Sequence, residues 1–470
     1  MVEKQIYRDS WIPTFNIRKL ADDKNVLVSP GGDWEIVSDE EAALTKQISI
    51  PDYLFNKLET KRLITTCNNS QSVFEQYHRW NRRHYTGTSL HIVVMTRRCN
   101  LKCLYCHASA KSQHIKEPAK YDLNIETAKK IVDFIFQTHN KEINIEFQGG
   151  ESLLNFDTLK FIVEYAQKVN QQKKKTLRFN LVSNLLLLEP EHCKFFKKHK
   201  VSLCTSLDGP SFIHDYQRRH PKGNGSYEQL IRSFEVLKQE NMQPPGVLMV
   251  ITKKSIEYYK ELVEMLIQLG LRDLSINYVQ PLGYARKNWG EIGIDYDTKL
   301  RNYKSVLDYT IEKWKDGIFI IERLFLIAVN KIFGLTDTLF TDFKNPCGMA
   351  IGQLTYMPNG DIFSCDEGRN FDFFKLGNVE SDNYVNILTS SKTLALVSSS
   401  IPDYTDCQSC AYRPFCGICP VLNYAQKING HNSSNDPRCR FNQFIYDYIF
   451  NMILTRHDVL NSYLIYREFV

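Results

Sequence analysis

The sequence predicts an α/β protein built on an incomplete, TIM-like barrel of about six parallel strands. Strand patterns alternate with helical patterns through the middle of the 470-residue chain, which favours a parallel sheet. The strands have one partly polar face, which favours a rolled sheet around a cleft. The pattern changes on either side, so we expect a small module before the barrel and a cysteine-rich extension after it.

Residues 1–85 are expected to form a winged-helix-like module. Residues 26–38 alternate as in a β-hairpin with a Gly-Gly turn. Ser38 and Glu41 have the spacing of a capping box, so a helix should begin there. A second helical stretch follows over residues 51–61.

Residues 86–290 are expected to form the barrel. Helical patterns, for example over residues 126–139 and 255–269, separate its strands. Because the strands of a parallel barrel point the same way, the site should lie at their carboxyl ends. The predicted strands span residues 90–96, 143–148, 177–183, 201–206, 247–252 and 274–280.

The second predicted strand shows the polar face most clearly. Asn144, Glu146 and Gln148 alternate there with apolar residues, and the fourth strand repeats the alternation with serine and cysteine. A closed eight-stranded barrel fills its interior with branched apolar side chains. A polar lining therefore indicates an incomplete barrel around a ligand.

The chain beyond the barrel divides into three parts. Residues 291–345 have the pattern of a helical connection. Residues 346–445 are rich in loop-forming residues and contain seven cysteines. Residues 446–470 are expected to form a C-terminal helix and tail.

Composition and charge exclude several classes of protein. The most apolar stretch contains Glu322 and Arg323, so no transmembrane helix or membrane partner is expected. The start of the chain has no basic stretch followed by an apolar run, so we expect no secretion signal and a cytoplasmic location. The formal net charge of +6 is scattered along the chain, which argues against nucleic-acid binding.

Thirteen cysteines are the most unusual feature of the composition. Disulfide frameworks are rare in cytosolic proteins, so clustered cysteines indicate metal or redox chemistry. Cys67, Cys193 and Cys204 stand apart and are expected to be small buried side chains. The others fall into two clusters.

The first cluster, CNLKCLYC, follows the first predicted strand at the expected mouth of the barrel. Cys99, Cys103 and Cys106 can bind three irons of a [4Fe–4S] cluster and leave the fourth iron without a protein ligand. The alternative is a zinc site completed by His107 or His114.

This spacing, with the aromatic Tyr105 before the last cysteine, resembles the radical S-adenosylmethionine (SAM) enzymes. The resemblance implies an incomplete α/β barrel in which the open iron is chelated by the amino and carboxylate groups of SAM. It also implies that a low-potential electron donor, such as flavodoxin or ferredoxin, reduces the cluster. SAM is then cleaved to a 5′-deoxyadenosyl radical, which abstracts hydrogen from the substrate.

Further motifs follow successive predicted strands, where a SAM site requires them. The glycines of QGGE allow close backbone approach to a ligand, and Glu151 can pair with an ammonium group. The SN pair offers a hydroxyl and an amide to a ribose, and Arg218 can hold a carboxylate by two hydrogen bonds. By position and by resemblance, the expected SAM-binding residues are Tyr105, Gln148, Gly149, Gly150, Glu151, Ser183, Asn184, Ser206, Asp208, Arg218 and Val279.

The second cysteine cluster resembles the SPASM extension of radical SAM enzymes, which holds two auxiliary [4Fe–4S] clusters, making three in all. CGIC departs from the family pattern, because it has two intervening residues where three are usual. The inner cluster lacks an evident fourth thiolate, so its fourth iron is open or takes a water, a carboxylate or a substrate atom. One or two zinc sites are the alternative. The resemblance assigns Cys347, Cys365 and Cys419 to the inner cluster and Cys407, Cys410, Cys416 and Cys439 to the outer one.

Asp366 directly follows Cys365 and is the candidate catalytic residue. An oxidised product usually loses a proton after hydrogen abstraction, and a carboxylate at this place can accept it. Sulfatase-maturing relatives have their proton acceptor at the corresponding position. The alternative is an aspartate that only caps a turn.

Over the whole chain, the sequence is similar to the His-Xaa-Ser system radical SAM maturase group. This resemblance depends on LHIVVMTRRCNLKCLYC, QGGESLLNF, QPLGYAR and YRPFCGICPV. It implies oxidative cross-linking of a ribosomally made precursor peptide, with a ring joined to an unactivated carbon, and an N-terminal module that binds a leader peptide as an added strand. Three alternatives remain: a sulfatase-type maturase that makes formylglycine from Ser or Cys, a non-enzymatic zinc or iron–sulfur protein, and an N-terminal module with a purely structural role.

Overall fold

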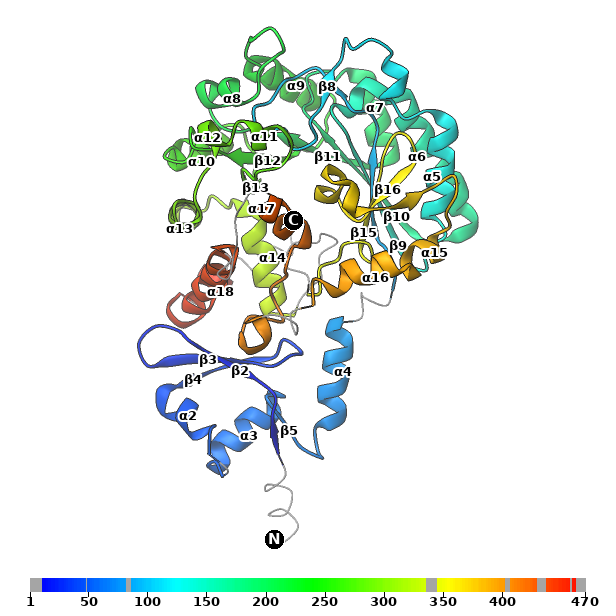
Figure 1. Ribbon diagram of the computed structural model, residues 1–470. Helices are drawn as coiled ribbons and strands as arrows, with labels where there is room; N and C mark the ends of the chain where they lie inside the picture. Colours follow the sequence, from blue (N-terminus) through cyan, green and yellow to red (C-terminus); the bar gives the residue numbers. More distant parts are fainter. Residues whose placement is uncertain are drawn as a thin grey trace.

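The computed structural model describes residues 11–47, 49–81, 86–334, 345–401, 406–428, 437–456 and 459–461. A small N-terminal module lies at one end of the molecule, and a large sheet with its helices occupies the rest (Figure 1). In the described chain, no helix is both long enough and apolar enough to cross a membrane.

The N-terminal module contains a three-stranded antiparallel sheet in the order β2-β3-β4. The predicted hairpin is confirmed as β3 and β4, and β2 is a strand that the sequence did not indicate. The capping box is also confirmed, because Ser38 Oγ accepts from Glu41 N at 3.0 Å while Glu41 Oε2 accepts from Ser38 N at 2.9 Å. The elements are β1 (Ile12–Pro13), β2 (Asn16–Lys19), β3 (Lys24–Val28), β4 (Trp34–Ser38), α2 (Asp39–Leu44), α3 (Asp52–Thr60), β5 (Ile64–Thr65) and α4 (Ser70–Asn81).

A ten-stranded, mostly parallel sheet forms the centre of the protein, in the order β14-β13-β12-β11-β10-β9-β6-β15-β16-β17. All six predicted strands are present in it as neighbouring parallel strands. They are β6 (Leu90–Val94), β9 (Glu142–Gln148), β10 (Thr176–Ser183), β11 (Val201–Ser206), β12 (Gly246–Ile251) and β13 (Asp273–Tyr278).

The sheet is larger than the sequence indicated. Within the predicted helical connection, β14 (Ile321–Glu322) adds one parallel strand beside β13. From the cysteine-rich part, β15 (Gln353–Tyr356) pairs in parallel with β6, and β16 (Asp361–Phe363) and β17 (Lys375–Asn378) extend the edge antiparallel. The two parts that contain cysteine motifs therefore share one sheet.

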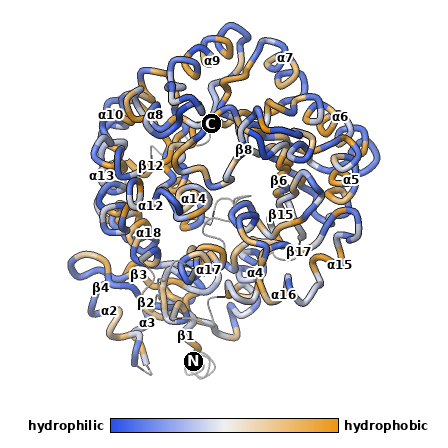
Figure 2. The backbone as a smooth tube through the Cα atoms, turned by 45° about the horizontal axis from the view of Figure 1, so that its top comes forward, coloured by the Kyte–Doolittle hydropathy of each residue, from blue (hydrophilic) through white to orange (hydrophobic). Residues whose placement is uncertain are grey.

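Helices surround the strands as an outer ring (Figure 2). Side chains on the helix-covered face of the sheet, such as Leu181 and Met249, are fully buried. On the opposite face, Asn180 and Cys204 are partly buried, whereas Asn144 and Glu146 of the predicted polar lining are buried. The main ring helices are α5 (Ile125–Ile135), α6 (Phe156–Lys173), α7 (Pro190–His199), α9 (Tyr227–Gln239), α10 (Tyr259–Gln268) and α13 (Tyr296–Lys315).

Shorter elements complete the chain around this frame. The loop with the first cysteines begins at β7 (Arg98–Cys99), which pairs with β8 (Lys111–Ser112). The other helices are α8 (Ser211–Gln217), α11 (Gly283–Lys287), α12 (Trp289–Ile292), α14 (Arg323–Ile332), α15 (Tyr384–Thr389), α16 (Ser391–Ser398), α17 (Pro420–Ile428) and α18 (Pro437–Thr455).

His91 on β6 makes the stability of this core dependent on pH. Its Nδ1 lies 2.9 Å from Tyr356 Oη, and burial lowers the pKa of His91 to about 3. The unfolded chain binds a proton at His91 below about pH 6.5, whereas the native chain does so only near pH 3. Stability should therefore fall as the pH drops below about 6.5, by about 2 kcal/mol at pH 5 from this side chain alone.

Urea unfolding of the parent protein and of His91→Asn at pH 7 and pH 5 measures this contribution. The loss of stability on acidification should be smaller in the variant, because asparagine does not titrate. The exposed His78→Asn serves as the control. Equal losses in His91→Asn and the parent would show that His91 does not cause the pH dependence.

Candidate active site

The three cysteines of the first motif lie on a buried loop that begins at β7. Cys99 and Cys103 are buried, and Cys106 is half-buried. The loop is fixed to the chain around α8, because Lys102 N donates to Arg219 O at 2.8 Å and Leu104 N donates to Gln217 O at 3.0 Å.

Electrostatics show that these thiols lie near one another. Burial raises the pKa of Cys99, and the neighbouring Cys103 and Cys106 raise it further. Burial also raises the pKa of Cys103 to about 12, although the charge of Arg218 lowers it. Iron would favour the thiolate forms, as metals do at coordinating thiols. The loop therefore presents three adjacent donors of the kind that an iron–sulfur cluster uses.

Tyr105, Asp208 and Arg218 form a buried network beside this loop. Tyr105 Oη donates to Asp208 Oδ2 at 2.6 Å and accepts from Arg218 Nη1 at 2.5 Å. Asp208 is also fixed by Gln217 Nε2 at 2.9 Å and by Val250 N at 3.1 Å. Three predicted residues that are far apart in the sequence therefore meet at one place.

Arg218 has unused hydrogen-bonding capacity that fits SAM. Its side chain is buried, and Nε has no hydrogen-bond partner in the described chain. A buried guanidinium donor without a partner is costly unless a ligand supplies the acceptor. The carboxylate of SAM is an acceptor of the type that guanidinium groups bind.

Glu151, Ser183 and Asn184 join the carboxyl ends of β9 and β10. Glu151 accepts from Ser183 Oγ at 2.6 Å, from Asn184 N at 2.8 Å and from Leu153 N at 3.0 Å. Asn184 Nδ2 in turn donates to Asn100 Oδ1 at 2.7 Å, next to Cys99. A carboxylate has about four acceptor positions, so Glu151 anchors the strand ends and keeps capacity for a ligand ammonium.

Gly149 and Gly150 pack against protein backbone. The sequence suggested close approach to a ligand instead. A Cβ atom on Gly149 would overlap Thr96 O, and one on Gly150 would overlap Arg98 O. Gly150 N donates to Thr96 O at 2.7 Å, so this approach is fixed by a hydrogen bond. The glycine pair therefore holds the segment that leads directly into Cys99.

Gly150→Ala should destabilise the protein by about 2–3 kcal/mol, because the backbone at Arg98 has to move. The displacement should also reduce iron retention, since Arg98 precedes Cys99. Chemical unfolding and iron analysis measure the two effects. Gly290→Ala is the matched control, because a Cβ there meets no atom within 4 Å. Parent-like stability of Gly150→Ala would contradict the packing argument.

The remaining predicted SAM residues lie at or just after strand ends. Gln148 and Ser206 are the half-buried last residues of β9 and β11. Val279 follows β13 and is buried; its N donates to Ile251 O at 3.0 Å and its carbonyl accepts from Lys299 Nζ at 3.2 Å. Both backbone groups of Val279 already have partners, so only its side chain is available for contact.

Asp366 is held between the two cysteine regions. Its Oδ2 lies 3.2 Å from His107 Nε2, and its Oδ1 lies 3.0 Å from Arg369 Nη2. Arg369 Nη2 also lies 3.0 Å from His107 Nε2 and 3.3 Å from Gln148 Oε1. Burial raises the pKa of Asp366, but Arg369 and His107 outweigh it, so that the net pKa is lowered.

Sequence analysis missed the roles of His107 and Arg369. His107 was considered only as a zinc ligand, but it contacts Asp366. Arg369 is almost fully buried, with 5% of its side chain exposed. The i, i+3 spacing of Asp366 and Arg369 was the available signal, but a short 3-10 helix over 367–370 leaves no clear sequence pattern.

The cysteines of the second cluster gather in two groups. Burial raises the pKa of Cys365, and the charges of Glu367, Cys419 and Cys347 raise it further. Glu367 acts on Cys419 in the same way and is a carboxylate neighbour that the sequence analysis did not single out. In the described chain, no three His, Cys, Asp or Glu side chains are close enough to hold a single metal ion.

The second group contains Cys407, Cys410 and Cys416. Burial raises the pKa of Cys416 to about 12, Asn442 lowers it, and Cys410 and Cys407 raise it. Asn442 Nδ2 donates to Cys416 Sγ at 3.2 Å from α18. Cys439 is an exposed residue one turn earlier on that helix.

Of the three isolated cysteines, only Cys193 is buried as expected. Cys193 is buried on α7, and Cys204 is half-buried on the accessible face of the sheet. Cys67 is exposed, so the prediction of a buried side chain is wrong there. It lies between β5 and α4, outside the core of the N-terminal module.

A family model described as Radical SAM superfamily matches residues 93–266, the part that contains CNLKCLYC, the QGGE motif and Arg218. A radical SAM cyclopropyl synthase, TigE, of Paramaledivibacter caminithermalis is 25% identical over 75% of this chain and 73% of its own length. A cysteine-type anaerobic sulfatase-maturating enzyme of Clostridium perfringens is 23% identical over 68% of this chain and 84% of its own length. An uncharacterised protein of Methanocaldococcus jannaschii is 30% identical over 40% of this chain, and the match spans only 62% of that relative.

Solved structures show the same fold. The structure of native anSMEcpe with bound AdoMet matches with a TM-score of 0.67 at 20% identity, covering 80% of this chain and all of that one. Streptococcus suis SuiB bound to its precursor peptide SuiA matches with a TM-score of 0.55 at 16% identity, covering 88% and 97% of the two chains. The non-enzymatic alternative is therefore set aside. Residues 93–266 are a radical SAM domain, and the chain is an enzyme similar to a radical SAM cyclopropyl synthase and to sulfatase-maturating enzymes.

Proposed function

We propose that this enzyme oxidatively modifies a ribosomally made precursor peptide in the cytoplasm, forming a cross-link between a ring and an unactivated side-chain carbon. The main support is the position of Asp366, which is half-buried beside His107 of the cysteine loop and paired with Arg369, which in turn contacts Gln148 of the QGGE motif. Among its relatives, TigE is a cyclopropyl synthase, and SuiB was solved with a precursor peptide bound.

Three [4Fe–4S] clusters are part of this proposal. The first would be held by Cys99, Cys103 and Cys106 with SAM on its open iron, the inner auxiliary cluster by Cys347, Cys365 and Cys419, and the outer one by Cys407, Cys410, Cys416 and Cys439. When bound and reduced by a low-potential donor such as flavodoxin or ferredoxin, the first cluster and SAM supply a radical that abstracts hydrogen.

The residues of this chain would bind SAM and accept a proton. Arg218 would hold the carboxylate of SAM with its unpartnered Nε, and Glu151 would hold the ammonium group. Asp366 would accept the proton that the oxidised substrate loses, an auxiliary cluster would take the electron left behind, and Arg369 and His107 would keep the carboxylate in place. The other predicted contacts, from Tyr105, Gly150, Ser206 and Val279, would surround SAM.

The N-terminal module would bind the leader of the precursor. Its three-stranded sheet ends at β4, which pairs on one side only in the described chain. An edge strand can accept an extended peptide as an added strand. A precursor with its leader should then have a lower KM than the modified segment alone.

Formation of formylglycine from Ser or Cys is the second candidate function. Sulfatase-maturating enzymes of both the cysteine and serine type are among the relatives, at 23–26% identity. The chemistry would use the same SAM site and the same proton acceptor. The two candidates differ in the product, so a product assay can separate them.

The test uses anaerobically purified, reconstituted protein. About twelve irons per chain and dithionite-dependent 5′-deoxyadenosine would support three clusters and a radical enzyme, whereas about four irons would remove the auxiliary clusters. Synthetic peptides encoded near the gene, and sulfatase-type peptides, are then incubated with the enzyme. Cross-linking and oxidation of Ser each remove about 2 Da, as loss of two hydrogens requires, but only formylglycine reacts with hydrazides. A hydrazide-reactive product would overturn the cross-linking proposal.

A further inference from the structure

The N-terminal module contacts the loop that carries three cysteines of the second group. Asn16 on β2 donates from Nδ2 to Gln408 O at 3.1 Å and to Cys410 O at 3.3 Å. Trp80 on α4 donates from Nε1 to Pro414 O at 3.2 Å. Two elements of the module therefore bind main-chain carbonyls between Cys407 and Cys416, although almost 400 residues of sequence separate Asn16 from Cys410.

Aromatic packing strengthens the same junction. The ring of Trp80 meets that of Phe415 edge-on, with centroids 5.7 Å apart. Trp34 on β4 donates from Nε1 to Ile332 O at 2.7 Å and packs edge-on against Phe450 of α18 at 5.2 Å. The module is thus seated on the loop and on the helix that carries Cys439.

Arg18 brings a positive charge into this junction. Its Nε and Nη2 donate to the two carboxylate oxygens of Asp447 at 3.1 and 2.7 Å. Asp447 Oδ1 also accepts from Tyr412 Oη at 2.6 Å, and the Arg18 guanidinium lies 5.8 Å from the centre of the Tyr412 ring. Asn16, which binds Cys410 O, lies two residues before Arg18 on β2, so the two side chains share one face of the strand and the guanidinium lies beside the segment from Cys410 to Tyr412.

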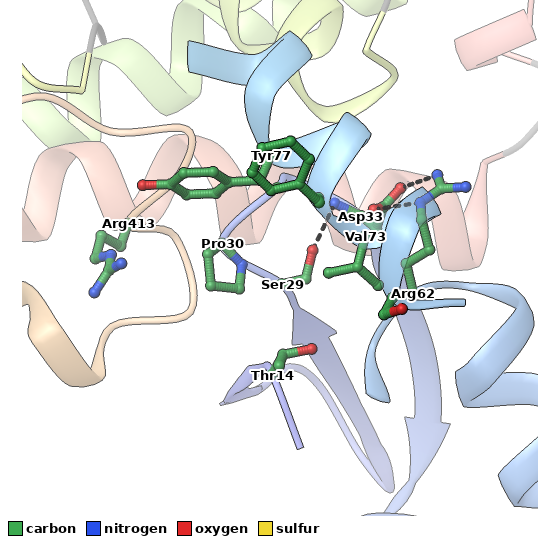
Figure 3. Close-up of a pocket in the computed structure, with 11 residues that line it drawn as sticks. Thr14, Ser29, Pro30, Asp33, Arg62, Val73, Tyr77 and Arg413 are labelled. Atoms are coloured by element: carbon green, nitrogen blue, oxygen red, sulfur yellow. Dashed lines mark hydrogen bonds and ion pairs between the residues drawn. The ribbon is translucent and has the colours of Figure 1, made fainter. Parts of the chain in front are cut away.

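The cavity at this junction has walls from both parts. It measures about 430 Å³ and is lined by Thr14, Ser29, Pro30 and Tyr77 of the module and by Arg413 of the loop. Figure 3 shows Tyr77 and Pro30 between Arg413 on one side and the Asp33–Arg62 pair on the other. The segment between Cys410 and Cys416 therefore faces the N-terminal module.

We propose that the N-terminal module forms one wall of the outer auxiliary-cluster site and that Arg18 is a positioning residue that raises the reduction potential of that cluster. The inference rests on the proposed function, because it requires the outer cluster to be present. A cluster held by thiolates is anionic, and its potential depends on nearby charge, hydrogen bonds and solvent exposure. A guanidinium beside Cys410 favours the more negative, reduced state, so it raises the potential.

The experiment uses the full chain with all clusters reconstituted. Iron content and a redox titration followed by electron paramagnetic resonance are measured for the parent, Arg18→Gln, Arg18→Lys and Arg62→Gln. The signal of the outer cluster is identified as the one lost in Cys410→Ala. Arg62 is the matched control, because it forms the same kind of two-bonded pair, with Asp33, within the module.

Arg18→Gln should shift the potential of the outer cluster downward while the other two potentials stay unchanged. Arg18→Lys should return the potential most of the way to the parent value, because the positive charge is present again. Arg62→Gln should have the same potential as the parent. Selective loss of about four irons in Arg18→Gln would also support the module as a wall of the site. If Arg18→Gln retains about twelve irons and its outer-cluster potential is unchanged, the inference is wrong and the proposed function is unaffected. If the parent protein contains only about four irons, the auxiliary clusters are absent and the inference fails with them.

Discussion

Replacing Cys99, Cys103 and Cys106 together with alanine should abolish SAM cleavage, with 5′-deoxyadenosine falling to background. The three thiols lie on one loop, next to the network of Tyr105 and Arg218 that we propose binds SAM. Without them the cluster that supplies the electron to SAM has no protein ligands. The measurement is 5′-deoxyadenosine formed per chain under dithionite, together with iron content.

Iron analysis makes this prediction specific. About four of about twelve irons should be lost, because the cysteines of the second cluster remain in place. Cys193→Ala is the matched control, since Cys193 is a buried thiol on α7, outside both cysteine clusters. Residual SAM cleavage by the triple variant would show that these cysteines do not form the SAM-binding site.

The parts of the fold that could be predicted have strong local signals. The six predicted strands alternate in short patterns separated by helices, and each is found in the central sheet. The CNLKCLYC loop and the capping box at Ser38 depend on residues within a few positions of each other. The pairing of β15 with β6 had no such signal, because it joins Gln353 to Leu90. Only tertiary structure brings these strands together.

The site was predicted unevenly for the same reason. Arg218 and Asp208 could be placed because they follow the fourth predicted strand, which is present as β11. Gly150 was assigned to the site, but the physical reason is contact with Arg98 backbone, which a sequence pattern does not reveal. The contact of Arg18 with Asp447 and the contact of His107 with Asp366 cross hundreds of residues, so they could be found only in the structure.

Asp366→Asn should preserve SAM cleavage and reduce product formation by about 100-fold or more, as expected when a general base is lost. Asparagine has nearly the shape of aspartate, and its side chain can still lie against Arg369 Nη2, which is 3.0 Å from Asp366 Oδ1 in the parent. The variant should therefore keep the local structure and lose only the ability to take a proton. The measurement compares 5′-deoxyadenosine with modified peptide in the same reaction, on whichever peptide the parent enzyme modifies.

The ratio of these two quantities separates a base from a structural residue. Loss of a base should leave 5′-deoxyadenosine nearly unchanged while product falls, because hydrogen abstraction precedes proton transfer. Loss of structure should lower both together, along with the iron content. Asp372→Asn is the control, since Asp372 is an exposed carboxylate six residues away. If Asp366→Asn forms product as efficiently as the parent, another group accepts the proton, and the contacts of Asp366 with Arg369 and His107 only join the two cysteine regions.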